Sequence, residues 1–96
     1  MTAEIVAARV RAFVLENFYV SEPEKLGDED SLIARGVVDS TGFLEIIVFL
    51  EAAFSLRIED HELVPGNFES IARIAAFVAR KGASEGALGR AAAPGV

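Results

Sequence analysis

Apolar residues recur every three or four positions in three segments of the chain, which is the pattern of amphipathic helices. The first segment spans residues 3 to 19, and its apolar face consists of Val6, Val10, Phe13, Val14 and Phe18. Thr2 precedes this helix as an N-cap residue, and Pro23 and Gly27 mark its exit. We therefore expect a first helix that packs into a core along one face.

A second helix should begin at Asp39 or Ser40 and end near Ser55. With 100° between successive residues, its core face is predicted to consist of Phe43, Ile47, Leu50 and Phe54, with Ile46 at the edge. The opposite face carries Thr41, Glu45, Val48 and Ala52, flanked by Leu44 and Phe49. This second face is partly apolar, and an apolar patch ringed by carboxylates favours a contact with another protein.

A long loop from Asp28 to Asp39 separates these two helices. Four of its residues are apolar, and we expect them to pack back on the core: Leu32, Ile33, Val37 and Val38. An irregular loop of this length inside a small domain is usually functional.

The rest of the chain predicts a short helical turn from Glu59 to Leu63, stopped by Pro65 and Gly66, and then a last helix from Phe68 to Lys81. Asn67 is its expected cap, and its inner face consists of Phe68, Ile71, Ile74, Ala75 and Val78. The Ala/Gly-rich tail over residues 83–96 lacks apolar periodicity, so we expect it to be disordered. The fold class that follows is all-α, a small bundle of three longer helices and one short helix over residues 1–82.

The composition limits where the protein works. The 96 residues are 52% apolar and include no cysteine, which excludes disulfides, cysteine zinc sites and cysteine nucleophiles. The chain start has no basic region before an apolar stretch, so a signal peptide is not expected. The most apolar segment, Phe43 to Leu56, is interrupted by two glutamates and is too short to span a bilayer. We expect a cytoplasmic protein without a membrane span.

Negative charge is concentrated in the middle of the chain. The net charge is −6, yet the segment from Asp28 to Glu69 holds ten acidic residues against Arg35 and Arg57. Such a surface repels phosphate backbones, so we expect no nucleic-acid partner. It attracts basic patches on other proteins and speeds their encounter.

Few residues offer reactive chemistry. His61 is the only histidine and lies among carboxylates without a second soft ligand, so a solvated helix face is favoured over a metal site. A hydrolase using Ser40 and His61 is conceivable, but residues 36–42 (GVVDSTG) do not match G-x-S-x-G and no α/β sheet is predicted. We therefore expect no catalytic residue, no metal site and no enzymatic activity.

Ser40 remains as a candidate. Serine is a common N-cap, and a cap inside an acidic helical interaction module is the plain interpretation. However, Asp39 can cap equally well, which would leave one of the two side chains chemically free. The free amides at a helix N-terminus would also stabilise a phosphate attached there.

Residues 32–40 (LIARGVVDS) closely resemble the attachment-site region of acyl carrier proteins and related peptidyl and aminoacyl carrier domains. The resemblance covers roughly residues 3 to 81 and continues through Glu45, Leu50, Glu51, Phe54, Ile58, Asp60 and residues 67–71 (NFESI). It implies that Ser40 takes a 4′-phosphopantetheine arm from coenzyme A, whose thiol holds an acyl or aminoacyl group as a thioester. It also implies a partner-binding surface made of Asp39, Thr41, Leu44, Glu45, Val48 and Glu51.

The resemblance further implies a monomeric stand-alone carrier and the partners that serve it. These are a magnesium-using phosphopantetheinyl transferase, an acyl- or aminoacyl-loading ligase, and downstream transferases with basic docking patches. Fatty-acid-synthesis carriers usually follow the serine with leucine and an acid, whereas here Thr41 and Gly42 follow. Asp-Ser-x-Gly is more similar to D-alanyl carrier proteins and to free-standing carriers served by adenylating ligases. The cargo, whether fatty acyl, polyketide or amino acid, stays open.

Overall fold

The computed structural model describes the backbone of residues 2–92 and the side chains of residues 2–82. Its elements are α1 (Ala3–Asn17), η1 (Pro23–Lys25), α2 (Ser40–Phe54), η2 (Asp60–Glu62), α3 (Pro65–Phe68) and α4 (Ile71–Ala92), where η marks a 3-10 helix. The prediction of a small all-α bundle with three longer helices and one short helix is confirmed. Among the helices of this described part, none is both long and apolar enough to cross a membrane.

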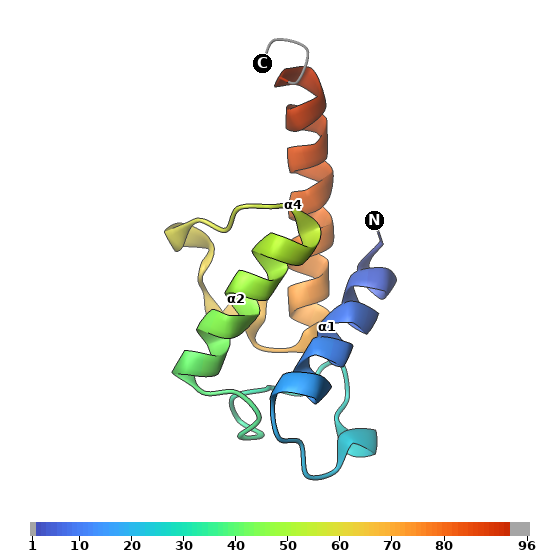
Figure 1. The fold of residues 1–96 in the computed structure, drawn as a ribbon, viewed down its shortest axis with the longest axis vertical. Coiled ribbons are helices and arrows are strands. Elements are labelled where there is room, and N and C mark those ends of the chain that lie inside the picture. The colour runs from blue at the N-terminus through green and yellow to red at the C-terminus, as the bar shows by residue number, and fades with distance from the viewer. Residues whose placement is uncertain (1, 93–96) are drawn as a thin grey trace.

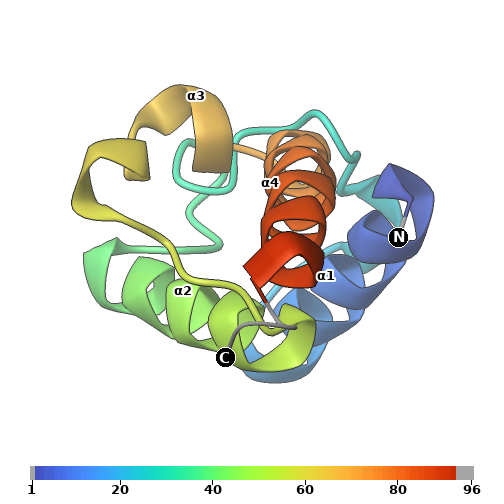
Figure 2. The same cartoon turned by 90° about the horizontal axis from the view of Figure 1, so that it is seen from above.

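The helix α4 forms the axis around which the other elements are arranged. Helix α1 packs along it, and the C-terminal part of α4 projects beyond the other helices (Figure 1). Seen along α4, α1 and α2 lie next to each other, and the short elements η2 and α3 lie across from α2 (Figure 2). The start of α2, with Ser40, is therefore at the opposite end of the bundle from the projecting part of α4.

The core is almost entirely apolar. Its fully buried side chains come from all three long helices and from the long loop: Val6, Val10, Val14, Leu32, Leu50, Ile71, Ile74 and Val78. Burying a side chain of this kind contributes roughly 1.5–3 kcal/mol, so these residues dominate the stability. A chain of aromatic contacts extends the core, because Phe68 packs against both Phe43 and Phe77 with ring centroids 5.4 Å and 5.0 Å apart.

The first helix agrees with its prediction except at its end. The Thr2 hydroxyl accepts a hydrogen bond from the Ile5 amide at 3.2 Å, as expected of the N-cap. The helix ends at Asn17, before the predicted residue 19. Phe18 follows it as the C-cap residue in an extended conformation, and its half-buried ring turns towards the start of α2.

The predicted core face of α2 was rotated from the observed one. The buried positions are Gly42, Ile46, Leu50 and Phe54, so Ile46 lies at the centre of the face and not at its edge. Phe43 and Ile47, which were predicted to be core residues, are only partly buried. Phe49 was assigned to the outer side, yet its ring stacks on Phe13 of α1 with centroids 4.2 Å apart. Apolar residues surround most of this helix, so hydropathy alone does not fix its orientation.

The segment before α4 also differs from the prediction. The expected turn at Glu59–Leu63 is confirmed as η2, but Pro65 begins the short helix α3 and does not end a turn, as proline at the first helical position can. Asn67 therefore lies within α3 and is not the cap of α4. The Ser70 hydroxyl takes that place by accepting a hydrogen bond from the Arg73 amide at 3.1 Å.

The end of α4 is a further correction. Its backbone continues to Ala92, past Gly82 where the sequence predicted the helix to end. Alanine, the strongest helix former, is frequent after residue 82, which favours continuation of the helix in spite of the glycines there. The predicted disorder of residues 83–96 is not tested, because the side chains beyond residue 82 and all of residues 93–96 lie outside the described residues.

Candidate functional site

The N-terminus of α2 is capped by Asp39. Its Oδ1 atom accepts a hydrogen bond from the Gly42 amide at 2.8 Å, and its backbone is extended as an N-cap requires. Ser40 is the first residue of the helix and is exposed. Its hydroxyl makes no hydrogen bond to any other residue that the structure describes, so it has no part in capping the helix.

The loop before Asp39 is held in place by Leu32. The Leu32 amide donates to the Glu69 carbonyl at 2.9 Å, and the Leu32 carbonyl accepts from both Val37 and Val38 at 2.9 Å and 3.2 Å. The side chains of Leu32 and Val38 are buried, as predicted, and Val37 is half-buried. Together these contacts fix the position of the residues that lead into Ser40.

In the same loop, the backbone conformation of Gly36 and the exposure of Ile33 bear on the site. Gly36 has a φ of 72°, a left-handed conformation that favours glycine over every other residue. Ile33 was expected to pack on the core, but 55% of its surface is exposed. The preceding residue, Leu32, is buried instead. Ile33 is therefore an exposed apolar residue close to the start of α2.

Gly42 allows Phe18 to approach the first turn of α2. An ideal Cβ at this position would lie 2.5 Å from Phe18 Cε1 and 3.3 Å from Val38 Cγ1. A side chain at residue 42 would therefore displace the ring. The glycine two residues after Ser40 thus has a packing reason, which sequence reasoning had recorded only as a departure from a family pattern.

An open depression of about 500 Å³ lies beside Ser40. Ser40 and Asp39 form one edge, and Phe18, Ile33, Gly36, Val37 and Val38 line the rest. The depression brings together the end of α1, the tip of the long loop and the start of α2. His61 does not line it, so nothing in this geometry supports the hydrolase hypothesis of Ser40 with His61.

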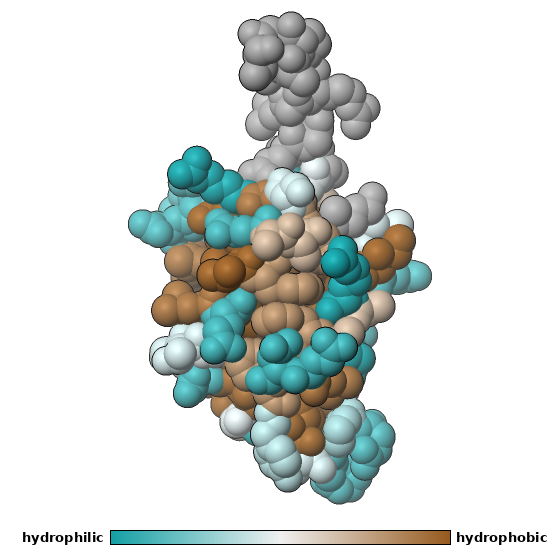
Figure 3. Space-filling model, viewed as in Figure 1, coloured by the Kyte–Doolittle hydropathy of each residue, from teal (hydrophilic) through white to brown (hydrophobic). Residues whose placement is uncertain are grey.

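The outer face of α2 carries two exposed apolar residues. Leu44 is 63% exposed and Val48 is 65% exposed, which confirms the predicted orientation of both side chains. Thr41 and Glu45 are exposed beside them. On the face of the molecule drawn in Figure 3, apolar surface lies over α2 with hydrophilic residues at its margins. We call Asp39, Thr41, Leu44, Glu45 and Val48 the docking face.

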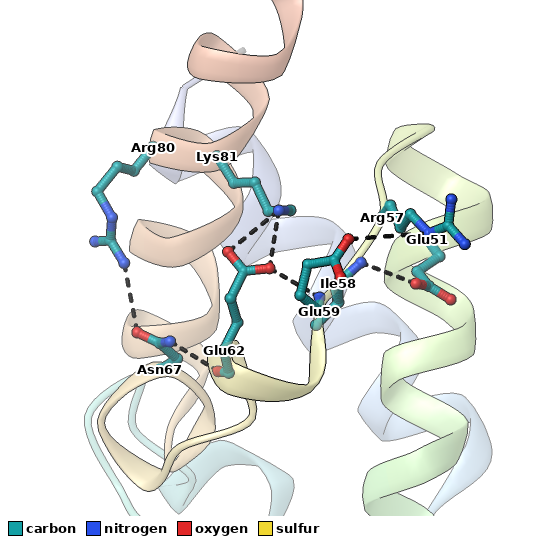
Figure 4. Close-up of polar contacts among 8 residues, drawn as sticks. All are labelled: Glu51, Arg57, Ile58, Glu59, Glu62, Asn67, Arg80 and Lys81. Atoms are coloured by element: carbon teal, nitrogen blue, oxygen red, sulfur yellow. Dashed lines mark hydrogen bonds and ion pairs between the residues drawn. The ribbon is translucent and has the colours of Figure 1, made fainter.

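Glu51 differs from the other residues predicted for partner binding. It is half-buried, and its Oε2 atom accepts a hydrogen bond from the Ile58 amide at 2.9 Å. This bond ties the end of α2 to the segment that leads into η2 (Figure 4). Glu51 thus has a structural role, and its part in partner binding stays a prediction. Because it is half-buried, whereas Asp39 is exposed, we leave Glu51 out of the docking face.

A network of polar contacts holds η2 against α4. Lys81 Nζ donates to both carboxylate oxygens of Glu62 at 2.9 Å and 3.1 Å, and the Glu59 amide donates to one of them at 2.8 Å (Figure 4). The Asn67 side-chain amide donates to the Glu62 carbonyl at 2.9 Å. Sequence reasoning missed this network, because residues 62 and 81 are far apart in the chain.

The environment of Glu62 changes its acidity. Burial by itself raises the pKa of Glu62, but the hydrogen bonds from Lys81 and from the Glu59 amide, with the charges of Lys81 and His61, more than offset it. The net result is a pKa below the ordinary value of 4.5. The Glu62–Lys81 pair is thus an ionised link between η2 and α4.

The described residues contain no cluster of three or more histidine and acidic side chains that could hold a metal ion. His61 is exposed on η2, as expected of a solvated face. Two further exposed apolar residues, Leu63 and Val64, follow η2 and were not identified from the sequence.

Comparisons with known proteins leave the family of this chain open. No protein-family model matches the sequence, and no curated protein matches it.

Proposed function

We propose that this chain is an acyl or aminoacyl carrier protein that is modified on Ser40 with 4′-phosphopantetheine. One observation carries the proposal. Asp39 caps α2 through the Gly42 amide, which leaves the Ser40 hydroxyl exposed and without a hydrogen-bond partner in the described structure. A serine that served only as a helix cap would use its hydroxyl for capping.

The surroundings of Ser40 fit a phosphate ester. Ser40 is the first residue of α2, where backbone amides point out of the helix and stabilise negative charge. In the attachment step, the Ser40 oxygen forms a bond to the phosphorus next to the pantetheine of coenzyme A. The phosphoanhydride bond breaks, adenosine 3′,5′-bisphosphate leaves, and the hydroxyl proton passes to a base of the transferase. When bound, the arm supplies a thiol that carries the cargo as a thioester.

The docking face supports the role of presenting a cargo to partner enzymes. Leu44 and Val48 expose apolar surface that contributes nothing to the core, next to the carboxylates of Asp39 and Glu45. A small apolar centre inside a charged rim is the usual composition of a protein interface. We propose that a phosphopantetheinyl transferase, a loading ligase and downstream transferases bind here through basic patches.

The intact mass of the protein tests the proposal. The purified chain is incubated with coenzyme A, magnesium and a transferase of broad specificity, and it should gain the mass of one phosphopantetheinyl group. Peptide mapping should locate that group on Ser40, and Ser40→Ala should abolish the gain. Modification at Ser31 or Ser55, or no gain with a transferase that modifies a control carrier, would refute the proposal.

The alternative is an acidic helical interaction module without a prosthetic group. The exposed Leu44 and Val48 favour a protein contact in this case as well. Ser40→Ala distinguishes the two functions. In a carrier the substitution abolishes the function completely, whereas an interaction module retains its binding to a partner.

A further inference from the structure

The depression beside Ser40 has the size of a ligand site. Its volume of about 500 Å³ falls within the roughly 300–1,000 Å³ of small-molecule pockets. Because Ser40 itself forms part of the edge, a group attached to its hydroxyl begins at this depression. A group attached to Ser40 therefore reaches the depression directly.

The wall of the depression is partly apolar. Ile33 is 55% exposed although Leu32, next to it, is buried. The half-buried Phe18 and Val37 continue this surface. The exposed surface of Ile33 carries a solubility cost without a gain in stability, and its place beside Phe18 and Val37 in one concave site indicates an apolar binding partner.

The same wall offers unused hydrogen-bond acceptors. The Leu32 carbonyl accepts two backbone hydrogen bonds, whereas the carbonyls of Gly36 and Val37 accept none from the described residues. Carbonyls of this kind pair well with the N–H groups of an amide-bearing chain. A ligand with both methyl groups and amides would therefore match the depression.

We propose that the depression is the docking site of the pantetheine arm, an inference that rests on the proposed modification of Ser40. The geminal methyl groups of the arm pack on Phe18, Ile33 and Val37, and its amide N–H groups donate to the carbonyls of Gly36 and Val37. A short tether gives an effective concentration on the order of millimolar, so contacts too weak for the free molecule suffice. Apart from Asp39, which borders the depression, the docking face stays free for a partner while the arm rests here.

Gly42 is the residue that makes this site possible. Its lack of a Cβ lets the Phe18 ring lie on the first turn of α2, where the ring helps to line the depression. A larger residue at position 42 would push the ring out of this place. Gly42, two residues after the serine, therefore shapes the proposed arm-binding site.

Nuclear Overhauser contacts in the modified protein test the proposal. Intact mass first establishes that the arm is present. We then expect contacts between the geminal methyl protons of the arm and the Ile33 methyl groups and the Phe18 ring. Ile33→Ser should lose the contacts to Phe18 as well. The matched control is Leu44→Ser, because Leu44 is similarly exposed but lies on the docking face, and it should retain them.

The possible failures are distinguishable. No mass gain with an active transferase overturns both the proposed function and the docking of the arm. A full mass gain without contacts between the arm and Phe18 or Ile33 overturns only the docking. Contacts to Phe68 and Ile74, which line an apolar pocket in the interior that Ile33 also borders, would mean that the arm enters the core and would overturn it too. Equal loss of contacts in Ile33→Ser and Leu44→Ser would have the same consequence.

Discussion

The ring of Phe18, which follows the end of α1, lies against the backbone of Gly42 in the first turn of α2. A Cβ atom at residue 42 would come within 2.5 Å of Phe18 Cε1. This contact joins the two helices at the level of Ser40. It also explains why glycine, which has a low helix propensity, occurs in the first turn of a helix whose other residues are mostly apolar.

Replacing Gly42 tests this contact. Gly42→Ala forces the Phe18 ring to shift, and overpacking of this kind costs about 1–3 kcal/mol, against a gain in helix propensity of about 1 kcal/mol. We therefore expect a net loss in the free energy of unfolding of up to about 2 kcal/mol, measured by urea denaturation. Gly66→Ala is the control, because nothing lies within 4 Å of its Cβ position, and it should be neutral or stabilise by up to about 1 kcal/mol. Equal effects of the two changes would contradict the contact.

Substitutions of the neighbouring residues Asp39 and Ser40 should separate effects on stability from effects on function. Asp39→Ala removes the acceptor of the Gly42 amide and should cost about 0.5–2 kcal/mol of stability. Ser40→Ala removes only an exposed hydroxyl without a partner in the described structure, so the free energy of unfolding should change by no more than about 0.5 kcal/mol. Thermal melts measure the first effect, and the mass gain with coenzyme A measures the function. A Ser40→Ala protein that unfolds would instead favour a structural role for the serine.

Substitutions on the buried and the exposed face of α2 should likewise differ in their effects on stability and on function. Ile46 is 2% exposed, so Ile46→Ala should cost about 2–5 kcal/mol through lost burial and a cavity. Leu44 is 63% exposed, and Leu44→Ala should change stability by less than about 0.5 kcal/mol. The rate of loading by the transferase should fall in Leu44→Ala, since the docking face loses its apolar centre. If Leu44→Ala melts as readily as Ile46→Ala, the assignment of the two faces is wrong.

The sequence predicted the existence of the helices better than their orientation. Periodicity located α1, α2 and the body of the last helix, because each has a continuous apolar stripe, but it placed the start of the last helix at Phe68 and not at Ile71. It misplaced the centre of the α2 core face, because Phe43, Ile46 and Ile47 are all apolar and only packing against neighbouring helices selects Ile46. A glycine has no hydropathy to contribute, so the burial of Gly42 could not be inferred from the pattern at all.

The candidate site was predictable only where local rules decide the structure. Asp39 and Ser40 were both recognised as possible caps, since N-cap preferences depend on the local sequence. The choice between them depends on backbone geometry, as does the exposure of Ile33. The depression beside Ser40 is built by residues from α1, the loop and α2, and such a meeting of distant segments is invisible in a single sequence.

Charge on the docking face should control the rate of encounter with basic partners. Glu45→Lys should slow loading mainly through association, and the effect should weaken as salt is added, because screening acts over roughly 8–10 Å near physiological ionic strength. Glu16→Lys is the matched control, since Glu16 is exposed on α1 and outside the docking face. Glu51→Lys is less suitable, because it also breaks the hydrogen bond to the Ile58 amide. Loading that is insensitive to salt and to Glu45→Lys would exclude this face as the docking site.

The link between η2 and α4 should give the protein a specific sensitivity to acid. The pKa of Glu62 is lower in the folded protein than its ordinary value of 4.5, so folding favours the ionised form. Its contribution to stability is therefore fully present above pH 4.5 and is lost as the pH falls through the lowered pKa. Glu62→Gln removes the charge, and near neutral pH it should cost about 1–3 kcal/mol through the weakened bonds to Lys81.

Unfolding free energies of the original protein and Glu62→Gln, measured from neutral pH down through the acid range, test this link. The difference in unfolding free energy between the two proteins should be constant near neutral pH and should vanish below pH 4.5, because a protonated Glu62 and a glutamine are both uncharged. The difference between the proteins is the informative quantity, since the remaining carboxylates titrate in both. Glu16→Gln, which changes an exposed residue for which the structure gives no ion pair among the described residues, should show no such difference. A difference for Glu62→Gln that stays constant through the acid range would mean that it does not arise from the ionised Glu62–Lys81 pair.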